Sequence, residues 1–177
     1  MIVSFCCWQN IALNAGAIQS STYSTHSASL AVDGNINGGP IEGGIHYSLS
    51  MTDAGDLSFW EVDLNGSYNI SKIFVFNRFF AADRINGFNL KVLDADNNAQ
   101  YNYTDPDASG RNLFEIDLQG DGGIKEGSKV RIELSKTLTT DNHLHLAEVM
   151  VFGEQVRNLN AWSQIQKNVF FMNYVCT

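Results

Sequence analysis

The chain has 177 residues, of which 44% are hydrophobic and 17% charged, a composition typical of globular proteins and not of disordered ones. A formal net charge of −8 argues against nucleic acid as a partner. The apolar runs fall short of the ~18 residues that a membrane span requires, so no span is expected.

The first 57 residues are rich in Ser, Thr, Gly and Asn and show little periodicity. This composition predicts ordered loops, in which binding sites are common. Asp33 and Asn35, separated by Gly34, could offer oxygens to a hard cation such as Ca²⁺, or could simply cap their own loop in an Asx turn. The residues alone favour the two interpretations equally.

From residue 58 onward the apolar residues recur with a period of two, which predicts β-strands. The predicted strands cover residues 59–64, 69–77, 87–95, 113–118, 128–134 and 144–152, and polar turns separate them. Such short strands indicate an antiparallel sandwich or barrel. The turn at residues 105–110 begins like a calcium loop, but Ile116 stands at the twelfth position, so a hairpin turn is favoured.

No catalytic motif is found, neither a nucleophile elbow nor a zinc-protease or phosphate-binding motif, so the chain is not expected to be an enzyme. His143 and His145 alternate on one strand face and could together contact a transition metal. We favour the other interpretation, in which the two histidines are exposed or hydrogen-bonded. Cys6, Cys7 and Cys176 lie near the two ends of the chain, and both a disulfide and reduced thiols remain open.

Residues 154–177 depart from the strand pattern. Apolar residues, Trp162 and Ile165 among them, recur there at roughly helical spacing. We expect an added extension, helical in part, that packs on the domain or contacts a protein partner.

Four segments, in order, are similar to the fucolectins, or F-type lectins, of the coagulation factor 5/8 type C (discoidin), galactose-binding-like group. They are "NIALNAGAIQSSTYSTHSASLAVDGNING", "SFWEVDLNGSYNISKIFVFNR", "DRINGFNLKVLD" and "HLHLAEVMVFG". The resemblance covers about residues 10–153, leaving residues 1–9 and 154–177 as extensions. It implies an all-β fold, an antiparallel jelly-roll β-sandwich with ligand-binding loops at one end.

The resemblance also implies a structural calcium ion. Asp33 and Asn35 match side-chain ligands, and Glu148 matches a carboxylate from the last strand. Leu30 and Ser48 match positions that lend backbone carbonyls.

The sugar site of the family matches less fully. Arg78 matches the first arginine of the family pattern, but Met51 stands where a histidine belongs and Phe80 where an aspartate belongs. Arg84, the second basic residue, comes one position early, and Phe79 adds apolar surface. Because no acid follows Arg78 by two places, we expect its guanidinium to be less preorganised and fucose specificity to be lost.

The expected function is therefore a non-catalytic, calcium-stabilised carbohydrate-binding module, with a specificity altered from fucose. Its partner would be a glycan or glycoprotein, and its location secreted or at the extracellular surface, in a role such as cell adhesion. The alternative is a structural or protein-interaction subunit that keeps the lectin-like fold without sugar binding.

Overall fold

The computed structural model of the chain describes residues 9–39, 48–55, 57–106, 110–135 and 143–156. Every pairing among the described strands is antiparallel, which confirms the predicted fold class. The strands are β1 (Gly16–Gln19), β2 (Ser50–Met51), β3 (Leu57–Phe76), β4 (Asn89–Leu93), β5 (Ala99–Thr104), β6 (Leu113–Asp117), β7 (Lys125–Ser135), β8 (His145–Leu146) and β9 (Glu148–Gln155). Two 3-10 turns, η1 (Ala28–Ala31) and η2 (Ala82–Ile85), are the only helices in these ranges, and neither could cross a membrane.

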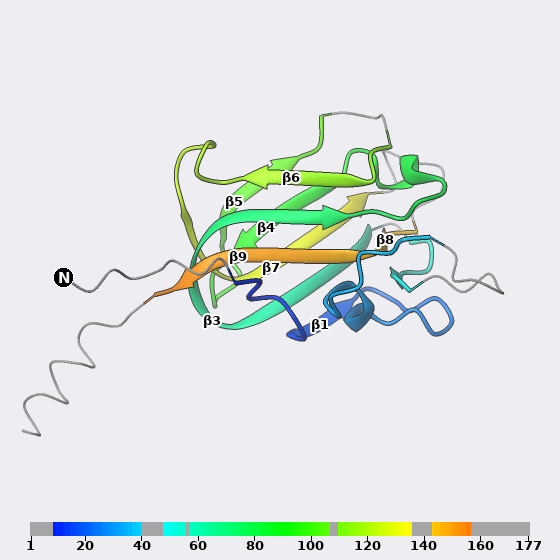
Figure 1. Cartoon of the computed structure of the whole chain (residues 1–177), viewed down its shortest axis with the longest axis horizontal. Helices are drawn as coiled ribbons and strands as arrows, with labels where there is room; N and C mark the ends of the chain where they lie inside the picture. The colour runs from blue at the N-terminus through cyan, green and yellow to red at the C-terminus, as the bar shows by residue number, and fades with distance from the viewer. Residues whose placement is uncertain (1–8, 40–47, 56, 107–109, 136–142, 157–177) are drawn as a thin grey trace, which may run out of the picture.

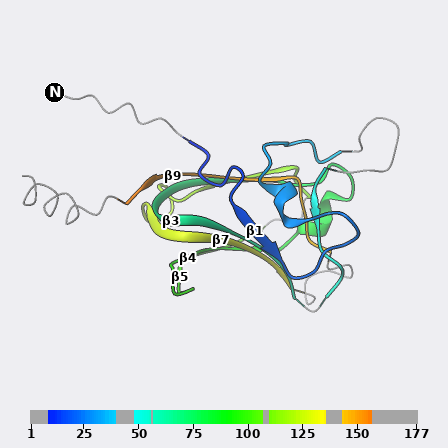
Figure 2. The same ribbon diagram turned by 90° about the horizontal axis from the view of Figure 1, so that it is seen from below.

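The long strand β3 joins the two layers of the sandwich (Figures 1 and 2). Its first half lies between β1 and β7, and its second half lies between β6 and β9. The register with β7 shifts between Asp63 and Tyr68, where Asn65 adopts a left-handed φ of 56°. The sequence predicts two strands here, because the polar residues at the bend interrupt the alternation.

The core fills the space between the two layers. Alternate residues of β3 point into it, among them Trp60, Val62, Ile73 and Val75, all fully buried. On the other face of the second half, Phe74 is half-buried and its ring meets that of Phe152 edge-on, with centroids 5.8 Å apart. Both faces of this central segment are therefore at least partly covered, as its apolar sequence predicts.

Trp60 also fixes the loop that leads to the predicted cation site. Its indole Nε1 donates a hydrogen bond of 2.9 Å to the carbonyl of Ala28 in η1. Because a buried indole N–H is costly without an acceptor, this bond secures η1 on β3. Asp33 follows η1 by two residues, so the cation loop begins from a fixed point.

The sandwich extends slightly beyond the boundary expected at residue 153. Strand β9 runs to Gln155, and the N–H of Val156 donates to the carbonyl of Ser67 at 2.9 Å. The three cysteines, Trp162 and Ile165 lie outside the described residues, and the predictions made for them remain predictions.

Candidate ligand-binding and cation sites

The two predicted sites lie at the same end of the sandwich. Phe76, the last residue of β3, is the cross-strand partner of Glu148, the first residue of β9. Arg78 follows β3 by two residues, while His145 on β8 precedes Glu148 by three. Glu148 of the predicted cation site and Arg78 of the predicted sugar site are therefore held at the same end of the β3–β9 pair.

Glu148 is a buried carboxylate at the centre of the predicted cation site. It is fully buried, and the N–H of Gly34 lies 3.2 Å from each of its two carboxylate oxygens. Burial, with a further contribution from the nearby charge of Asp33, raises the pKa of Glu148 to about 7, against the lowering effect of the loop N–H groups. Among the described residues no basic side chain contacts it, so a bound cation would offset the cost of this buried charge.

The loop that faces Glu148 contains an Asx turn. Oδ1 of Asp33 accepts from the N–H of Asn35 at 2.8 Å, and Oδ1 of Asn35 accepts from the N–H of Asn37 at 3.0 Å. The turn interpretation is thus confirmed, but it uses only one oxygen of the Asp33 carboxylate and leaves the calcium interpretation open. In the described ranges no group of three His, Cys, Asp or Glu side chains is arranged for a metal. A site here would therefore also need amide and carbonyl oxygens, and the parts assigned to Leu30 and Ser48 remain predictions.

The raised pKa of Glu148 predicts a measurable pH effect in chelator. The folded value of about 7 lies above the ordinary 4.5, so ionisation is disfavoured in the folded state. Stability from this group is therefore present at low pH and is lost as the pH rises from about 4.5 through 7. Glu148→Gln keeps the shape without the charge, and we expect it to be more stable than the native protein at pH 8 by on the order of 2 kcal/mol.

This difference should shrink toward zero as the pH falls below 4.5, where the native carboxyl is protonated in both the folded and the unfolded state. Urea unfolding of both proteins across this pH range, with EDTA present, is the measurement. If the difference in the free energy of unfolding between the two proteins did not change with pH, the raised pKa of Glu148 would be contradicted.

Gly38 connects the cation loop to the segment that carries Arg78. Its carbonyl accepts from the N–H of Phe79 at 2.9 Å. A Cβ at this position would lie only 2.5 Å from the carbonyl oxygen of Asn77 and 2.9 Å from the Cα of Arg78. Only glycine allows the two loops to pack this closely.

Gly38→Ala should therefore push the two loops apart. We expect a loss of about 1–2 kcal/mol in the free energy of unfolding, as for other overpacked sites. Gly16→Ala is a matched control, since a Cβ there meets no atom within 4 Å. Equal unfolding midpoints for the two variants would show that the contact at Gly38 is unimportant.

A cavity of about 320 Å³ lies beside these loops and contains most of the predicted sugar ligands. Its volume is at the lower end of the ~300–1,000 Å³ usual for small-ligand sites. The structure brings together Met51, on β2, with Arg78 and Arg84, from the segment between β3 and β4, as predicted. It adds three lining residues that the sequence analysis did not assign to a sugar site, namely Tyr23, His143 and His145.

Arg78 is held in place from two sides. Its side chain is buried, with 8% of the residue exposed, and its Nη1 lies 3.1 Å from Nε2 of His145. Its backbone N–H donates to Oδ1 of Asn77 at 2.8 Å. The amide of Asn77 in turn donates to the carbonyls of Ala82 and Arg111, at 2.8 and 3.0 Å. The expectation of a poorly fixed guanidinium is therefore wrong, because an imidazole takes the position of a partner that the sequence appeared to lack.

The histidines of the cavity are hydrogen-bonded, as favoured from the sequence. Nδ1 of His143 donates to the carbonyl of Thr52 at 2.8 Å, and the rings of His143 and His145 lie 6.0 Å apart. Burial, followed by the charges of Arg78 and Arg84, lowers the pKa of His145 to about 3. His145 is thus neutral at physiological pH. The alternation of His143 and His145 was a sequence signal that could have assigned them to the cavity. Tyr23 gave no such signal, because it lies in a loop without periodicity.

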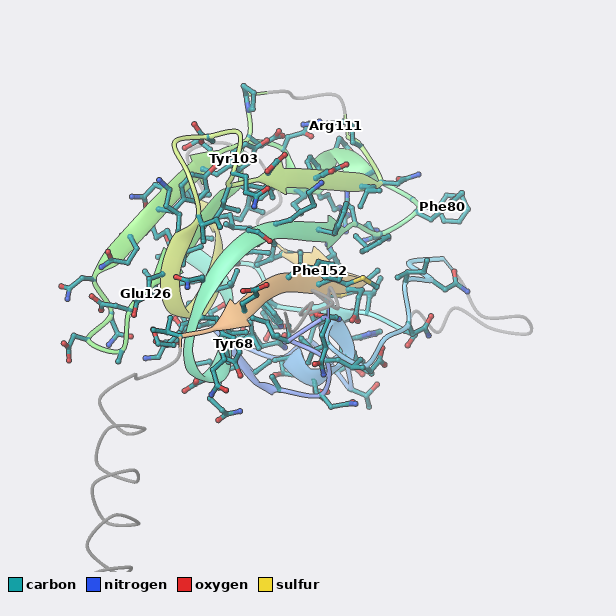
Figure 3. All side chains as sticks on the ribbon, turned by 60° about the vertical axis from the view of Figure 1, so that its left-hand side comes forward. Tyr68, Phe80, Tyr103, Arg111, Glu126 and Phe152 are labelled. Atoms are coloured by element: carbon teal, nitrogen blue, oxygen red, sulfur yellow. The ribbon has the colours of Figure 1, made fainter. Side chains whose placement is uncertain are left out.

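Phe79 and Phe80 lie outside the residues that line the cavity. They are 62% and 54% exposed, and their rings meet at a centroid distance of 5.9 Å. Figure 3 shows Phe80 projecting away from the sandwich. Ala81, with a left-handed φ of 49°, follows the pair. Their predicted contact with a ligand therefore remains a prediction, and it would have to occur outside the cavity.

The chain is similar in structure and sequence to known carbohydrate-binding modules and lectins. A Streptococcus pneumoniae fucose-binding module is 33% identical, with a TM-score of 0.69 over 81% of this chain and 96% of its own. The lectin domain of lectinolysin, solved with Lewis B antigen, is 31% identical, with a TM-score of 0.70 over 81% and 96%. A fucolectin from striped bass (Morone saxatilis) serum is 28% identical, with a TM-score of 0.67 over 84% of this chain and 50% of its own. No curated protein sequence matches the chain significantly.

The sequence itself matches a described domain family over most of the sandwich. Residues 30–132 match the NedA-like, galactose-binding domain of the F5/F8 type C group. The range includes the cation loop, Met51 and both arginines of the cavity. The suspected relationship is confirmed by this match and by the fucose-binding structural neighbours. The chain belongs to the F5/F8 type C, galactose-binding domain family.

Proposed function

We propose that this chain is a non-catalytic, lectin-like carbohydrate-binding module whose specificity differs from fucose. The observation that carries the proposal is the cavity, in which two arginines, two histidines and an exposed tyrosine converge. Neighbours that bind fucose or Lewis antigens support a sugar as the ligand.

The cavity offers the chemistry that a sugar requires. The guanidiniums of Arg78 and Arg84 present several N–H donors in rigid planes, suited to hydroxyl and ring oxygens. The ring of Tyr23 is 46% exposed and lies 5.8 Å from that of His143, so it offers an aromatic face at the edge of the cavity. Sugar C–H groups pack on such faces while their hydroxyls bind the donors.

The proposed change in specificity is based on two positions at which this chain departs from the family pattern. Met51 has a thioether, only a weak acceptor, where the family pattern has a histidine. Phe80 stands where the acid belongs; it projects away from the sandwich (Figure 3) and is not among the residues that line the cavity. We therefore expect free fucose to bind weakly or not at all, and a different glycan to fit the cavity better.

Calcium is proposed as the structural ion of the adjacent site. The residues fit it: the buried carboxylate of Glu148 lacks a basic partner in the described ranges, and Asp33 and Asn35 add oxygens of the kind Ca²⁺ binds. When bound, the ion would supply the positive charge that this pair of carboxylates needs. Leu30 and Ser48 would complete the site through their backbone carbonyls.

The non-catalytic and extracellular parts of the proposal are supported by the relatives. The similar structures are binding modules and lectins, and the striped bass protein is a serum lectin. We infer that this chain likewise binds glycans or glycoproteins without chemistry, outside the cell or on its surface.

A second candidate function is suggested by the exposed phenylalanine pair. Phe79 and Phe80 offer adjoining apolar rings on a loop that is not part of the cavity. Aromatic residues of this kind are enriched in protein interfaces. A structural or interaction subunit would use this pair and leave the cavity without a sugar.

A glycan array separates the two candidates. Native protein in calcium should bind a consistent class of glycans, and Phe80→Ser should leave that binding within about threefold if the cavity is the site. No binding to any glycan, together with self-association or a protein partner that Phe80→Ser abolishes, would favour the interaction subunit instead.

A further inference from the structure

We propose that His145, on β8, is a positioning residue for ligand binding: its neutral imidazole fixes Arg78 and so replaces the groups that this chain lacks at positions 51 and 80. The inference rests on the proposed function and names one residue on which that function depends. It is carried by the juxtaposition of three residues that are distant in sequence, Met51, Arg78 and His145.

The strand pairing explains how an imidazole comes to lie beside position 51. β2 and β8 pair antiparallel, and Met51 is the direct cross-strand partner of His145. Cross-strand partners share a sheet face with Cβ atoms about 4.5–5.5 Å apart. A histidine on β8 can therefore occupy nearly the same part of the cavity as a histidine on β2 would.

The hydrogen bond to Arg78 defines the state of the imidazole. A guanidinium only donates, so Nε2 of His145, 3.1 Å from Nη1, must be the acceptor. The proton of the neutral ring then lies on Nδ1, which is buried and has no partner among the described residues. The charged and titratable groups that face the ring are Arg78, Arg84, His143 and His26, and their charges, like burial, disfavour its protonation.

This arrangement does the work that an acid at position 80 would do. Both residues are nearly inaccessible, at 2% exposed for His145 and 8% for Arg78, so the bond is shielded from competing water. A guanidinium held by a buried acceptor keeps one rotamer, and little further ordering is needed when a ligand binds. The neutral ring also leaves the positive charge of Arg78 in place for ligand oxygens.

A set of variants tests the proposal on one printed array of neutral, fucosylated, sialylated and sulfated glycans. His145→Leu removes the acceptor, and we expect it to weaken binding of the strongest native hits at least tenfold. His145→Gln restores an acceptor oxygen at similar reach and should stay within about threefold of native. Melting temperatures of both variants serve as the folding control.

A double-variant cycle shows whether His145 acts through Arg78. In the Arg78→Ala background, His145→Leu should weaken binding no further. Full binding by His145→Leu, failure of His145→Gln to rescue, or an equal loss in both backgrounds would overturn the proposal.

Two results distinguish this inference from the proposed function. If native protein binds glycans and His145→Leu binds them equally well, the inference fails and the proposed function stands. If folded native protein binds no glycan on the array, both fail. A ¹⁵N NMR spectrum of the imidazoles needs no ligand: it should show His145 with its proton on Nδ1 at pH 6, and a proton on Nε2 would overturn the inference.

Discussion

Removing calcium should lower the melting temperature of the native protein, and the same loss should follow from Asp33→Ala in the presence of calcium. At a hundredfold excess over its dissociation constant, a ligand that binds only the folded state adds about 2.7 kcal/mol of stability. For a domain of this size that corresponds to a shift of roughly 5–11 °C. The physical reason is the buried carboxylate of Glu148, which the ion would neutralise.

Matched controls separate this effect from general damage. Asp96→Ala removes an equal charge from an exposed turn and should keep the full response to calcium. In EDTA, Asp33→Ala should melt within a few degrees of the native protein, because apart from the calcium increment it loses only the exposed hydrogen bond from the N–H of Asn35. Native protein that melts at the same temperature with calcium and with EDTA would contradict the calcium site.

Arg84→Ala should abolish glycan binding while leaving the fold intact. Arg84 lines the cavity from η2 and is only half-buried, so truncation should change stability by no more than about 0.5 kcal/mol. Hydrogen bonds from charged groups contribute about 1.5–3 kcal/mol, so the loss of its donors should weaken binding at least ~10-fold. Titration of array hits into native and variant protein measures this directly.

Lys129→Ala is the control for the change in net charge. Lys129 lies on β7, outside the residues that line the cavity, and its Nζ contacts Oδ1 of Asn97. It should bind glycans as the native protein does. A similar loss from Lys129→Ala would indicate that overall charge, and not the donors of Arg84, governs binding.

The fold could be predicted where one strand face is buried and the other is not. The alternation in β4, β6, β7 and β9 follows from that environment and was sufficient to predict an antiparallel sandwich. β1 and β5 are short and largely exposed, and Tyr101 is their only buried residue, so their apolar signal was too weak for a strand to be predicted. β2 and β8 have two residues each, too few for any period.

The ligand-binding site was predicted only in part. Arg78, Arg84 and Met51 could be assigned through the family pattern, and the structure brings them together in one cavity. The bond between Arg78 and His145 joins residues 67 positions apart, one just after β3 and the other on β8, and no local pattern reports such a contact. For that reason the sequence suggested a loose guanidinium where the structure has a fixed one.

The most direct test of the account is a calorimetric titration of the strongest array glycan into native and Arg84→Ala protein, both folded and saturated with calcium. The account predicts a saturable site in the native chain and binding at least ~10-fold weaker in the variant, at nearly equal melting temperatures. Equal affinities in the two proteins, or a native protein that binds no glycan, would contradict a sugar site built on the arginines of this cavity.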